Sequence, residues 1–394
     1  MPLISADAIY TPQGWATDRV LDLTAEGEVR TLRPRQPGEA VAQHRGLLVP
    51  GWVNAHCHLE LTALGGKIDE ATGMTGFIGQ LFRARAQLSG EKLQAGVQEG
   101  LAYLAQTGTA AVGDISNLPV SAEPKRQSSL YSHTFIELLG LAPAEAAERL
   151  AQGRQLAQSF ADLPHSLTPH APYSTSAELF RQIYASGSDR FSLHLLESAA
   201  ETELFNSGRG PFLDFYHRLG LPFAPFADRD PQKHALQDAP VNIPLILVHL
   251  TELPDTEVAN LVSALPQAWF CLCPRSNWFI HRRQPAVEAW AAHPDRVCLG
   301  TDSLASNYSL DLWEEVRWLQ ERYPSLGLHK VIRWATTNGA QALGIAKKFG
   351  TFAPASKPGV LLIERVSPVG QGWRLTPQSS LRLLFPGQRQ MFIA

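Results

Sequence analysis

Short apolar segments alternate with longer amphipathic segments through the middle of the chain. The short segments predict eight β-strands, at residues 47–56, 109–115, 132–140, 166–172, 191–197, 244–252, 268–273 and 297–303. Between most of them lie segments such as 91–108 and 144–163, whose apolar residues recur every three or four positions, as in helices. Strands that are apolar on both faces and alternate with helices predict an α/β fold with a parallel sheet.

The number and spacing of these units favour a (β/α)8 barrel, or TIM barrel, over an open doubly wound sheet. Eight strand–helix units over about 250 residues are usual for a closed barrel. No predicted strand is followed by a GxGxxG or GxxxxGK[ST] loop, which disfavours the open sheet. We therefore expect residues 47–345 to form the barrel.

The two ends of the chain predict a second, smaller unit. They contain short β-like pieces separated by glycine and proline, at residues 20–32, 359–366, 372–377 and 390–394. Neither end alone offers enough apolar surface for a stable core. We expect residues 1–46 and 346–394 to pair into one small β domain beside the barrel.

Composition and charge argue against nucleic acid and membranes as binding partners. A formal net charge of −3 offers no attraction for nucleic acid or an anionic membrane, and no apolar run is long enough to span a bilayer. The N-terminus lacks a secretory signal, and the four cysteines form neither a CxxC pair nor a disulfide framework. We expect a cytoplasmic protein that acts on a small molecule.

Five ionisable residues fall at the carboxyl ends of predicted strands. His56 and His58 end the first strand and project to one side, while His194, His249 and Asp302 end the fifth, sixth and eighth. In a barrel these ends meet at one mouth, where active sites lie. Singly, each could be a packed histidine or a helix cap. Together, they would be costly to bury without a metal, and nitrogen and oxygen donors suit zinc, iron(II) or manganese.

The order of motifs resembles the amidohydrolase superfamily, and within it the cytosine-deaminase and chlorohydrolase branch. The matching segments are PGWVNAHCHLEL (50–61), TPHAPYSTS (168–176), HLLES (194–198), CPRSN (273–277), GTDSLASN (300–307) and ATTNGAQALG (335–344). They cover almost the whole chain. The resemblance implies a distorted barrel with a small β-sandwich domain formed from both termini, and it suggests a homodimer.

The same resemblance implies one divalent ion per chain, Zn²⁺ or Fe²⁺. Its ligands by similarity are His56, His58, His194 and Asp302. Binuclear members bridge two ions with a lysine on the fourth strand, and segment 166–172 contains no lysine.

Catalytic roles follow from the resemblance as well. Glu197 completes the family's HxxE pattern, in which the glutamate protonates the ring nitrogen beside the attacked carbon. His249 and Asp302 are expected to orient the attacking water and take its proton. On position alone, Glu197 is equally well a solvated loop charge or a helix-cap partner. Simple amide hydrolysis needs no such acid, so Glu197 favours a deaminase.

Substrate contacts are expected from His170, Asn277 and Trp278, although each could instead stabilise its own loop. Residues 54–85 look closest to the aminofutalosine deaminases of menaquinone biosynthesis, which act on an adenine-type base of a nucleoside. Relatives acting on adenosylhomocysteine or methylthioadenosine carry a glutamate that grips the ribose hydroxyls. Segment 73–81 has no glutamate, which leaves any ribose contact unassigned.

Two alternatives to the deaminase stay open. One is a related hydrolase with another leaving group or a ring amide, such as a chlorohydrolase or an imidazolonepropionase-like enzyme. The other is a non-catalytic metal-binding scaffold, which the presence of every expected catalytic residue disfavours.

Overall fold

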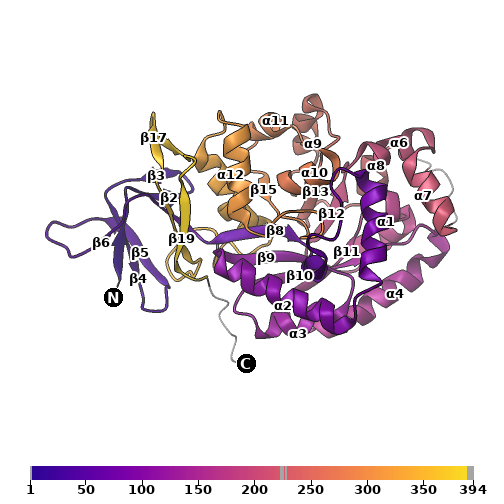
Figure 1. Cartoon of the computed structure of the whole chain (residues 1–394), viewed down its shortest axis with the longest axis horizontal. Helices are drawn as coiled ribbons and strands as arrows, with labels where there is room; N and C mark the ends of the chain where they lie inside the picture. Colours follow the sequence, from indigo (N-terminus) through magenta and orange to yellow (C-terminus); the bar gives the residue numbers. More distant parts are fainter. Residues whose placement is uncertain (1, 222–225, 227–228, 388–394) are drawn as a thin grey trace.

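The computed structural model describes residues 2–221, 226 and 229–387, so the predicted strand at 390–394 lies outside the described residues. The chain has an α/β fold containing two four-stranded parallel sheets (Figure 1). The strand order is β11-β10-β9-β8 in one sheet and β12-β13-β14-β15 in the other. These strands are β8 (Trp52–Cys57), β9 (Thr109–Ser116), β10 (Tyr131–Leu138), β11 (His165–Pro169), β12 (Phe191–Leu195), β13 (Leu245–His249), β14 (Ala268–Leu272) and β15 (Val297–Leu299).

All eight predicted central strands are present, and nearly every residue in them is buried. Strands covered on both faces leave no polar face to solvent, which accounts for their continuous apolar sequences. Register is regular in the second sheet, where Leu193 pairs with Leu247 and Leu247 with Phe270. In the first sheet, the β8–β9 pair contains two register shifts.

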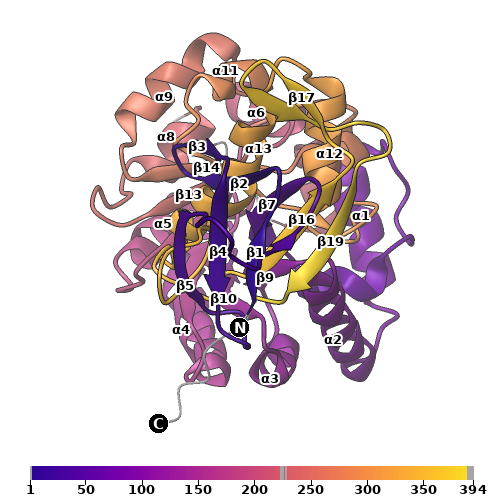
Figure 2. The ribbon, with the colours of Figure 1, turned by 90° about the vertical axis from the view of Figure 1, so that its left-hand side faces the viewer.

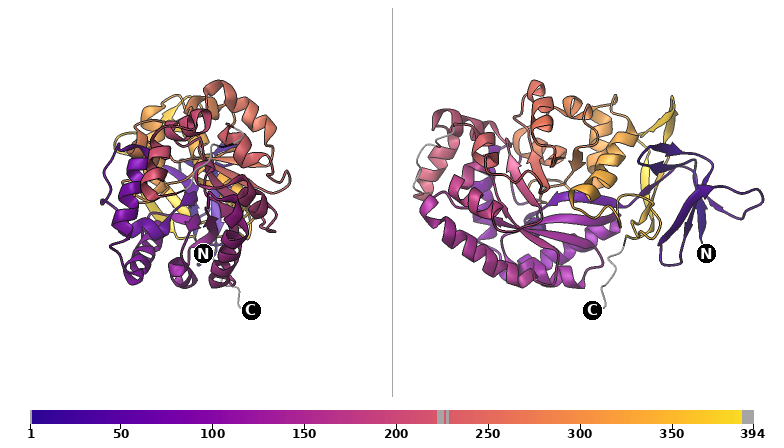
Figure 3. Two further views of the ribbon diagram at one scale, coloured as in Figure 1. Left: turned by 90° about the vertical axis from the view of Figure 1, so that its right-hand side faces the viewer. Right: turned by 180° about the vertical axis from the view of Figure 1, so that it is seen from behind.

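Helices lie outside the two parallel sheets (Figure 3). Ser89, Ser176 and Ser198 cap three of them by accepting the backbone N–H three residues later, which fixes where these helices begin. The helices are α1 (Gly73–Arg85), α2 (Gly90–Gln106), α3 (Ala122–Gln127), α4 (Ala146–Ala157), α5 (Ala177–Tyr184), α6 (Ala199–Ser207), α7 (Pro211–Leu219), α8 (Pro231–Leu236), α9 (Val258–Ala264), α10 (Pro274–His281), α11 (Val287–Ala291), α12 (Leu312–Arg322), α13 (Leu328–Arg333) and α14 (Gly339–Ala342). None of the described helices is long and apolar enough to cross a membrane.

Strands from both ends of the chain lie together beside the parallel sheets (Figure 2). One sheet has the order β5-β4-β1-β6, a second has β19-β16-β7-β2-β3, and β17 pairs with β18. Their bounds are β1 (Leu3–Ser5), β2 (Ala8–Thr11), β3 (Gly14–Ala16), β4 (Arg19–Leu23), β5 (Val29–Pro34), β6 (Ala42–Gln43), β7 (Leu47–Pro50), β16 (Val360–Glu364), β17 (Ser367–Val369), β18 (Gly372–Arg374) and β19 (Ser380–Phe385).

The segment predicted as one strand, 47–56, forms two. Its first part, β7, pairs with β2 and β16, whereas its second part, β8, pairs with β9 in a parallel sheet. Gly51 separates the two parts, and a Cβ there would lie 2.5 Å from the carbonyl oxygen of Pro358. The chain therefore changes sheets at a position that has room only for glycine.

Candidate active site

Polar side chains converge where the parallel strands end. His56 lies on β8 and His58 directly follows it, His194 lies on β12, and Asp302 follows β15. The Nε2 atom of His58 lies 3.2 Å from Nε2 of His56 and 3.3 Å from Nε2 of His194. The Oδ1 atom of Asp302 lies 3.4 Å from His58 Nε2 and 3.7 Å from His56 Nε2. Three imidazoles and one carboxylate therefore face a common point.

Unusual backbone conformations hold two of the polar residues in place. Asp302 has φ 57° and His249 has φ 76°, values that non-glycine residues seldom adopt. Backbone N–H of Asp302 donates to the His56 carbonyl at 3.1 Å. The hydroxyls of Ser276 and Ser306 donate to Asp302 Oδ2 at 2.6 and 2.7 Å, which leaves Oδ1 directed at the histidines.

Burial favours the neutral form of two of the clustered imidazoles, His58 and His194. It lowers the pKa of His58 to about 3 and the pKa of His194 well below its ordinary value. For Asp302, burial opposes ionisation, but the hydrogen bond to His56 and the nearby His58 and His249 outweigh it and lower its pKa well below the usual range. The cluster thus presents nitrogen lone pairs and a carboxylate.

This donor set fits a divalent metal ion. A single proton on His58 Nε2 could satisfy only one of its two imidazole neighbours. Ligands about 2.1 Å from a tetrahedral ion lie about 3.4 Å from one another, close to the observed nitrogen spacings. His56, His58 and His194 could therefore hold an ion together, and a second group that could do so contains Glu137, His170 and His194.

His249 and Glu197 form a second polar pair next to this cluster. His249 Nδ1 donates to Asn277 Oδ1 at 2.8 Å, so its Nε2 is an acceptor, and this atom lies 3.3 Å from Glu197 Oε1. Glu197 Oε2 accepts from the Tyr173 hydroxyl at 3.2 Å. Burial, with a smaller contribution from Asp302, raises the pKa of Glu197 well above its ordinary value. Burial therefore favours the protonated form of Glu197.

A strained turn presents Glu197 at the end of β12. Leu196 adopts φ 51°, and the backbone N–H of Glu197 donates to Glu201 Oε2 on α6 at 2.9 Å. Glu201 is fully buried, and burial raises its pKa to about 8. Glu201 thus positions the backbone of Glu197.

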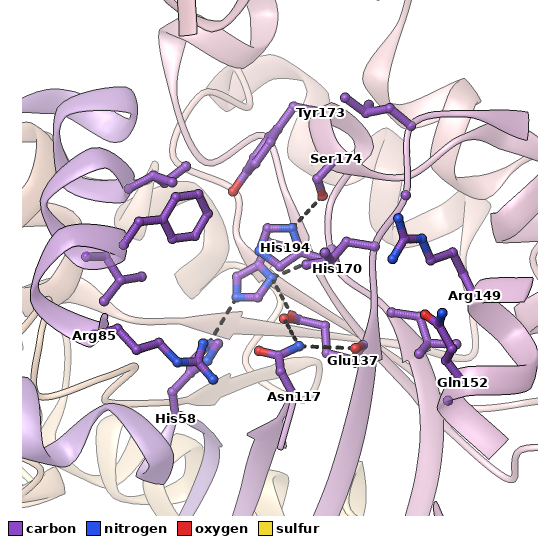
Figure 4. A pocket seen from close by; sticks show the side chains of 18 of the residues that line it. His58, Arg85, Asn117, Glu137, Arg149, Gln152, His170, Tyr173, Ser174 and His194 are labelled. Atoms are coloured by element: carbon purple, nitrogen blue, oxygen red, sulfur yellow. Dashed lines mark hydrogen bonds and ion pairs between the residues drawn. The ribbon is translucent and has the colours of Figure 1, made fainter. Parts of the chain in front are cut away.

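A cavity of about 1120 Å³ opens onto these residues and is lined in part by Glu197 and Asp302. His58 and His194 also line it (Figure 4). Its apolar wall comes mainly from α1 and α7, through residues that include Phe77, Leu81, Phe212 and Phe215. Its opposite wall comes partly from α4 and carries Arg149 and Gln152. An apolar pocket with a few convergent polar groups is the usual form of a small-molecule site.

Most of the residues expected from the sequence lie together here. The lining or the adjoining polar cluster contains His56, His58, His170, His194, Glu197, His249 and Asp302. His170 faces the cavity while its Nδ1 is hydrogen bonded to Ser174 Oγ at 2.5 Å, so its side chain both stabilises the loop and lines the cavity.

The two residues expected from α10 lie elsewhere. Asn277 contacts His249 and is absent from the lining of the cavity. Trp278 lines a separate hollow with Arg275, Tyr308 and Trp318. Consecutive residues on a helix point about 100° apart, so Trp278 turns away from the side on which Asn277 meets His249.

Three residues of the site were missed by the sequence reasoning. Glu137 ends β10 and lines the cavity, as do Tyr173 and Asn117. Glu137 carried a usable signal, because it is an acidic residue near the end of a predicted strand. Tyr173 and Asn117 carried no comparable signal.

The chain is similar in sequence to known proteins. The sequence profile of the Amidohydrolase family matches residues 47–365. The aminodeoxyfutalosine deaminase of Deinococcus radiodurans is 28% identical over 365 residues, covering 87% of this chain and 85% of that protein.

Solved structures also share the fold. The Helicobacter pylori aminofutalosine deaminase in complex with methylthio-coformycin aligns with a TM-score of 0.78 at 21% identity, covering 94% of both chains. The atrazine chlorohydrolase TrzN from Arthrobacter aurescens TC1, complexed with zinc, aligns with a TM-score of 0.75 at 15% identity, covering 98% of this chain and 94% of that one. With a family profile matched over most of its length, the chain belongs to the amidohydrolase family.

Proposed function

We propose that this protein is a metal-dependent aminohydrolase that removes ammonia from the adenine-type base of a nucleoside-like substrate, such as aminofutalosine. The observation that carries the proposal is the buried Glu197, 3.3 Å from His249 at the edge of a histidine and carboxylate donor set, where burial favours its protonated form. Hydrolysis of a cyclic amidine needs such an acid, whereas hydrolysis of a simple amide does not. The names of the Deinococcus relative and of the Helicobacter complex support a nucleoside substrate.

We infer that the eight parallel strands form one closed, distorted barrel. Backbone N–H groups of Thr301 and Asp302 donate to the His56 carbonyl at 3.1 Å, linking the end of β8 to the segment after β15. His194 N–H donates to the His170 carbonyl at 2.9 Å, linking β12 to the end of β11. The strands of 1–46 and 346–394, together with β7, then form the adjoining β-sandwich, and Gly51 is its boundary with the barrel.

One ion per chain, Zn²⁺ or Fe²⁺, is proposed for the site, with His56, His58, His194 and Asp302 as ligands. His194 Nδ1 lies 3.1 Å from the His170 carbonyl oxygen, an acceptor that requires a proton on Nδ1. The same nitrogen is then unavailable to a second ion beside Glu137, and β11 carries no lysine to bridge two ions. When bound, a divalent ion supplies a water activated for attack near neutral pH.

The side chains then divide the proton transfers between them. Glu197 donates its proton to the ring nitrogen next to the attacked carbon, and the Tyr173 hydroxyl holds the other carboxyl oxygen. His249 Nε2 accepts a proton from the attacking water, because Asn277 keeps the other ring nitrogen protonated. Asp302 Oδ1 accepts a hydrogen bond from the same water. The amino group then takes the proton held by His249 and leaves as ammonia, while the hydroxyl proton of the added water passes to Glu197, which restores both side chains.

Glu197→Gln tests this assignment. Glutamine has the same shape but no acidic proton, so the variant should keep its ion and lose most of the ammonia release, by about 100-fold or more. His249→Ala is the matched control for the ligand set and should also retain the ion, as measured by metal analysis. Unchanged turnover in Glu197→Gln would remove Glu197 from the acid role, and metal loss in His249→Ala would show that the ligand set is wrong.

A further inference from the structure

We propose that the carboxylate of Glu137 accepts hydrogen bonds from hydroxyl groups on the sugar of the substrate. This inference rests on the proposed nucleoside substrate and adds a specificity-determining residue to the site. It is carried by a buried carboxylate oxygen that faces the cavity without a hydrogen-bond partner.

One carboxylate oxygen of Glu137 is hydrogen bonded within the protein, and the other is available to a ligand. It lies at the end of β10 and is 6% exposed. Asn117 Nδ2 donates to Glu137 Oε2 and to the Glu137 carbonyl, each at 3.1 Å (Figure 4). Oε1 has no hydrogen-bond partner among the described residues. Asn117 therefore orients the carboxylate, and Oε1 is left to a bound molecule.

Orientation of His194 does not account for the free oxygen. His194 Nδ1 lies 3.6 Å from Glu137 Oε1, beyond ordinary hydrogen-bond distance, and its proton already goes to the His170 carbonyl at 3.1 Å. Leaving a buried carboxylate oxygen without a donor is unfavourable, and a ligand hydroxyl would relieve that cost. The position of Oε1 is thus suited to a ligand rather than to the histidine.

The other acidic residues of the cavity already have partners or roles, which leaves Glu137 Oε1 for the substrate. The four carboxylates that line the described cavity are Glu137, Glu145, Glu197 and Asp302. Glu197 and Asp302 serve the chemistry, and Glu145 is half-exposed and paired with Arg149 at 2.8 Å. Only Glu137 retains a buried oxygen for substrate recognition.

The α1 wall provides no alternative acceptor. Its lining residues are Met74, Phe77, Ile78, Leu81, Phe82 and Arg85, which are apolar or donate hydrogen bonds. Glu137, by contrast, lies beside His170 and His194, with ligand atoms within 4.8 Å of one another. A sugar attached to a base held next to the histidine cluster would therefore come within reach of Glu137.

Deleting the hydroxyls from the substrate tests the contact. The measurement is kcat/KM of the metal-loaded wild type and Glu137→Gln with adenosine and with 2′,3′-dideoxyadenosine. Asn117 Nδ2 donates to Oε2, so a glutamine would place its oxygen there and turn its NH2 group toward the cavity in place of Oε1. Glu137→Gln should therefore remove the acceptor and lower kcat/KM for adenosine by about 10- to 100-fold. The same substitution should change kcat/KM for the dideoxynucleoside by less than about 3-fold, because the contact is absent there.

Glu60→Gln is the matched control. Glu60 is an equally buried glutamate nearby, but its carboxylate is bonded to the backbone of Asn117 and Leu118 and to Arg85, and it is not part of the cavity lining. Any effect of Glu60→Gln should be the same for the two nucleosides. Glu137→Ala, which removes the whole carboxylate, should repeat the selectivity of Glu137→Gln.

Equal losses with both nucleosides in Glu137→Gln, or no loss with adenosine, would overturn the inference. A second metal equivalent that disappears in Glu137→Gln would overturn it too, in favour of a cation site. If the wild type releases ammonia from neither nucleoside, the proposed function fails for these substrates. In that case, the affinities of the two nucleosides for each protein, measured by calorimetry, test the Glu137 contact separately. The wild type should bind adenosine more tightly than the dideoxynucleoside, and Glu137→Gln should bind the two equally. The same preference for adenosine in both proteins would refute the contact.

Discussion

Glu201→Gln should make the protein more stable, and the gain should grow with pH. Burial raises the pKa of Glu201 to about 8, against an ordinary value of 4.5. The folded state therefore holds this proton more tightly than the unfolded state. Stability from this group is fully present below about pH 4.5 and is lost as the pH rises through about 8.

The two pKa values set the size of the effect. At about 1.4 kcal/mol per pKa unit, Glu201 costs the folded state about 3 kcal/mol more at pH 8 than at pH 5.5. Glutamine cannot ionise, but its side-chain oxygen can still accept the N–H of Glu197, as Glu201 Oε2 does at 2.9 Å. The free energy of unfolding of Glu201→Gln, minus that of the wild type, should thus rise by about 3 kcal/mol over this interval.

Urea unfolding at fixed metal concentration measures this difference, because effects shared by the two proteins cancel. Glu201→Ala is the control: it also cannot ionise, yet it leaves the buried Glu197 N–H unpaired, at a cost of about 1–3 kcal/mol at either pH. Parallel pH profiles for the wild type and Glu201→Gln would refute the reasoning, since they would show that Glu201 does not hold its proton through folding.

Two further predictions concern contacts behind the site. Asn277→Asp places a carboxylate against His249 Nδ1, in place of the amide oxygen at 2.8 Å, and should raise the pKa of His249, which burial now lowers. Because His249 must be neutral to accept a proton, the acidic limb of the kcat–pH profile should move to higher pH; an unmoved limb would contradict its role. Lys125→Met should lower the free energy of unfolding by about 3–5 kcal/mol in urea denaturation, since it leaves the buried Asp114 without its ion-pair partner at 2.5 Å. A loss below about 1 kcal/mol would show that Asp114 finds another partner.

Apolar periodicity was sufficient to locate the parallel strands. These strands are buried on both faces, so their sequences stand out from the amphipathic helices between them. The division of 47–56 was not predictable, because the segment is apolar on both sides of Gly51. What divides it is the approach of Pro358, about 300 positions away in the sequence, and only the folded chain reveals that contact.

The histidine cluster was predictable for a topological reason: the carboxyl ends of parallel strands meet. The same rule extends to Glu137 at the end of β10. The rule does not apply to α10, because the direction of a side chain on a helix depends on the rotation of the helix. Trp278 accordingly lies in a separate hollow. The rule also does not predict the role of Glu201, because the contact of Glu201 with Glu197 depends on the left-handed turn at Leu196.

The resemblance to the amidohydrolase family is confirmed by the match over residues 47–365. The roles of individual side chains remain predictions, because they depend on protons and on an ion that a sequence pattern does not specify. Hydrogen-bond partners narrow these roles considerably. Asn277, for example, assigns the tautomer of His249.

Ammonia release from a panel of aminated purine nucleosides, aminofutalosine included, tests the central claim most directly. The protein should first be analysed for metal, and we expect about one ion per chain, as one set of three imidazoles and a carboxylate provides. We expect strong ammonia release from at least one adenine-type nucleoside. If fully metallated protein releases no ammonia from any nucleoside of the panel, the proposed deaminase activity is contradicted. Substrates with other leaving groups, such as halide, would then be the next to test.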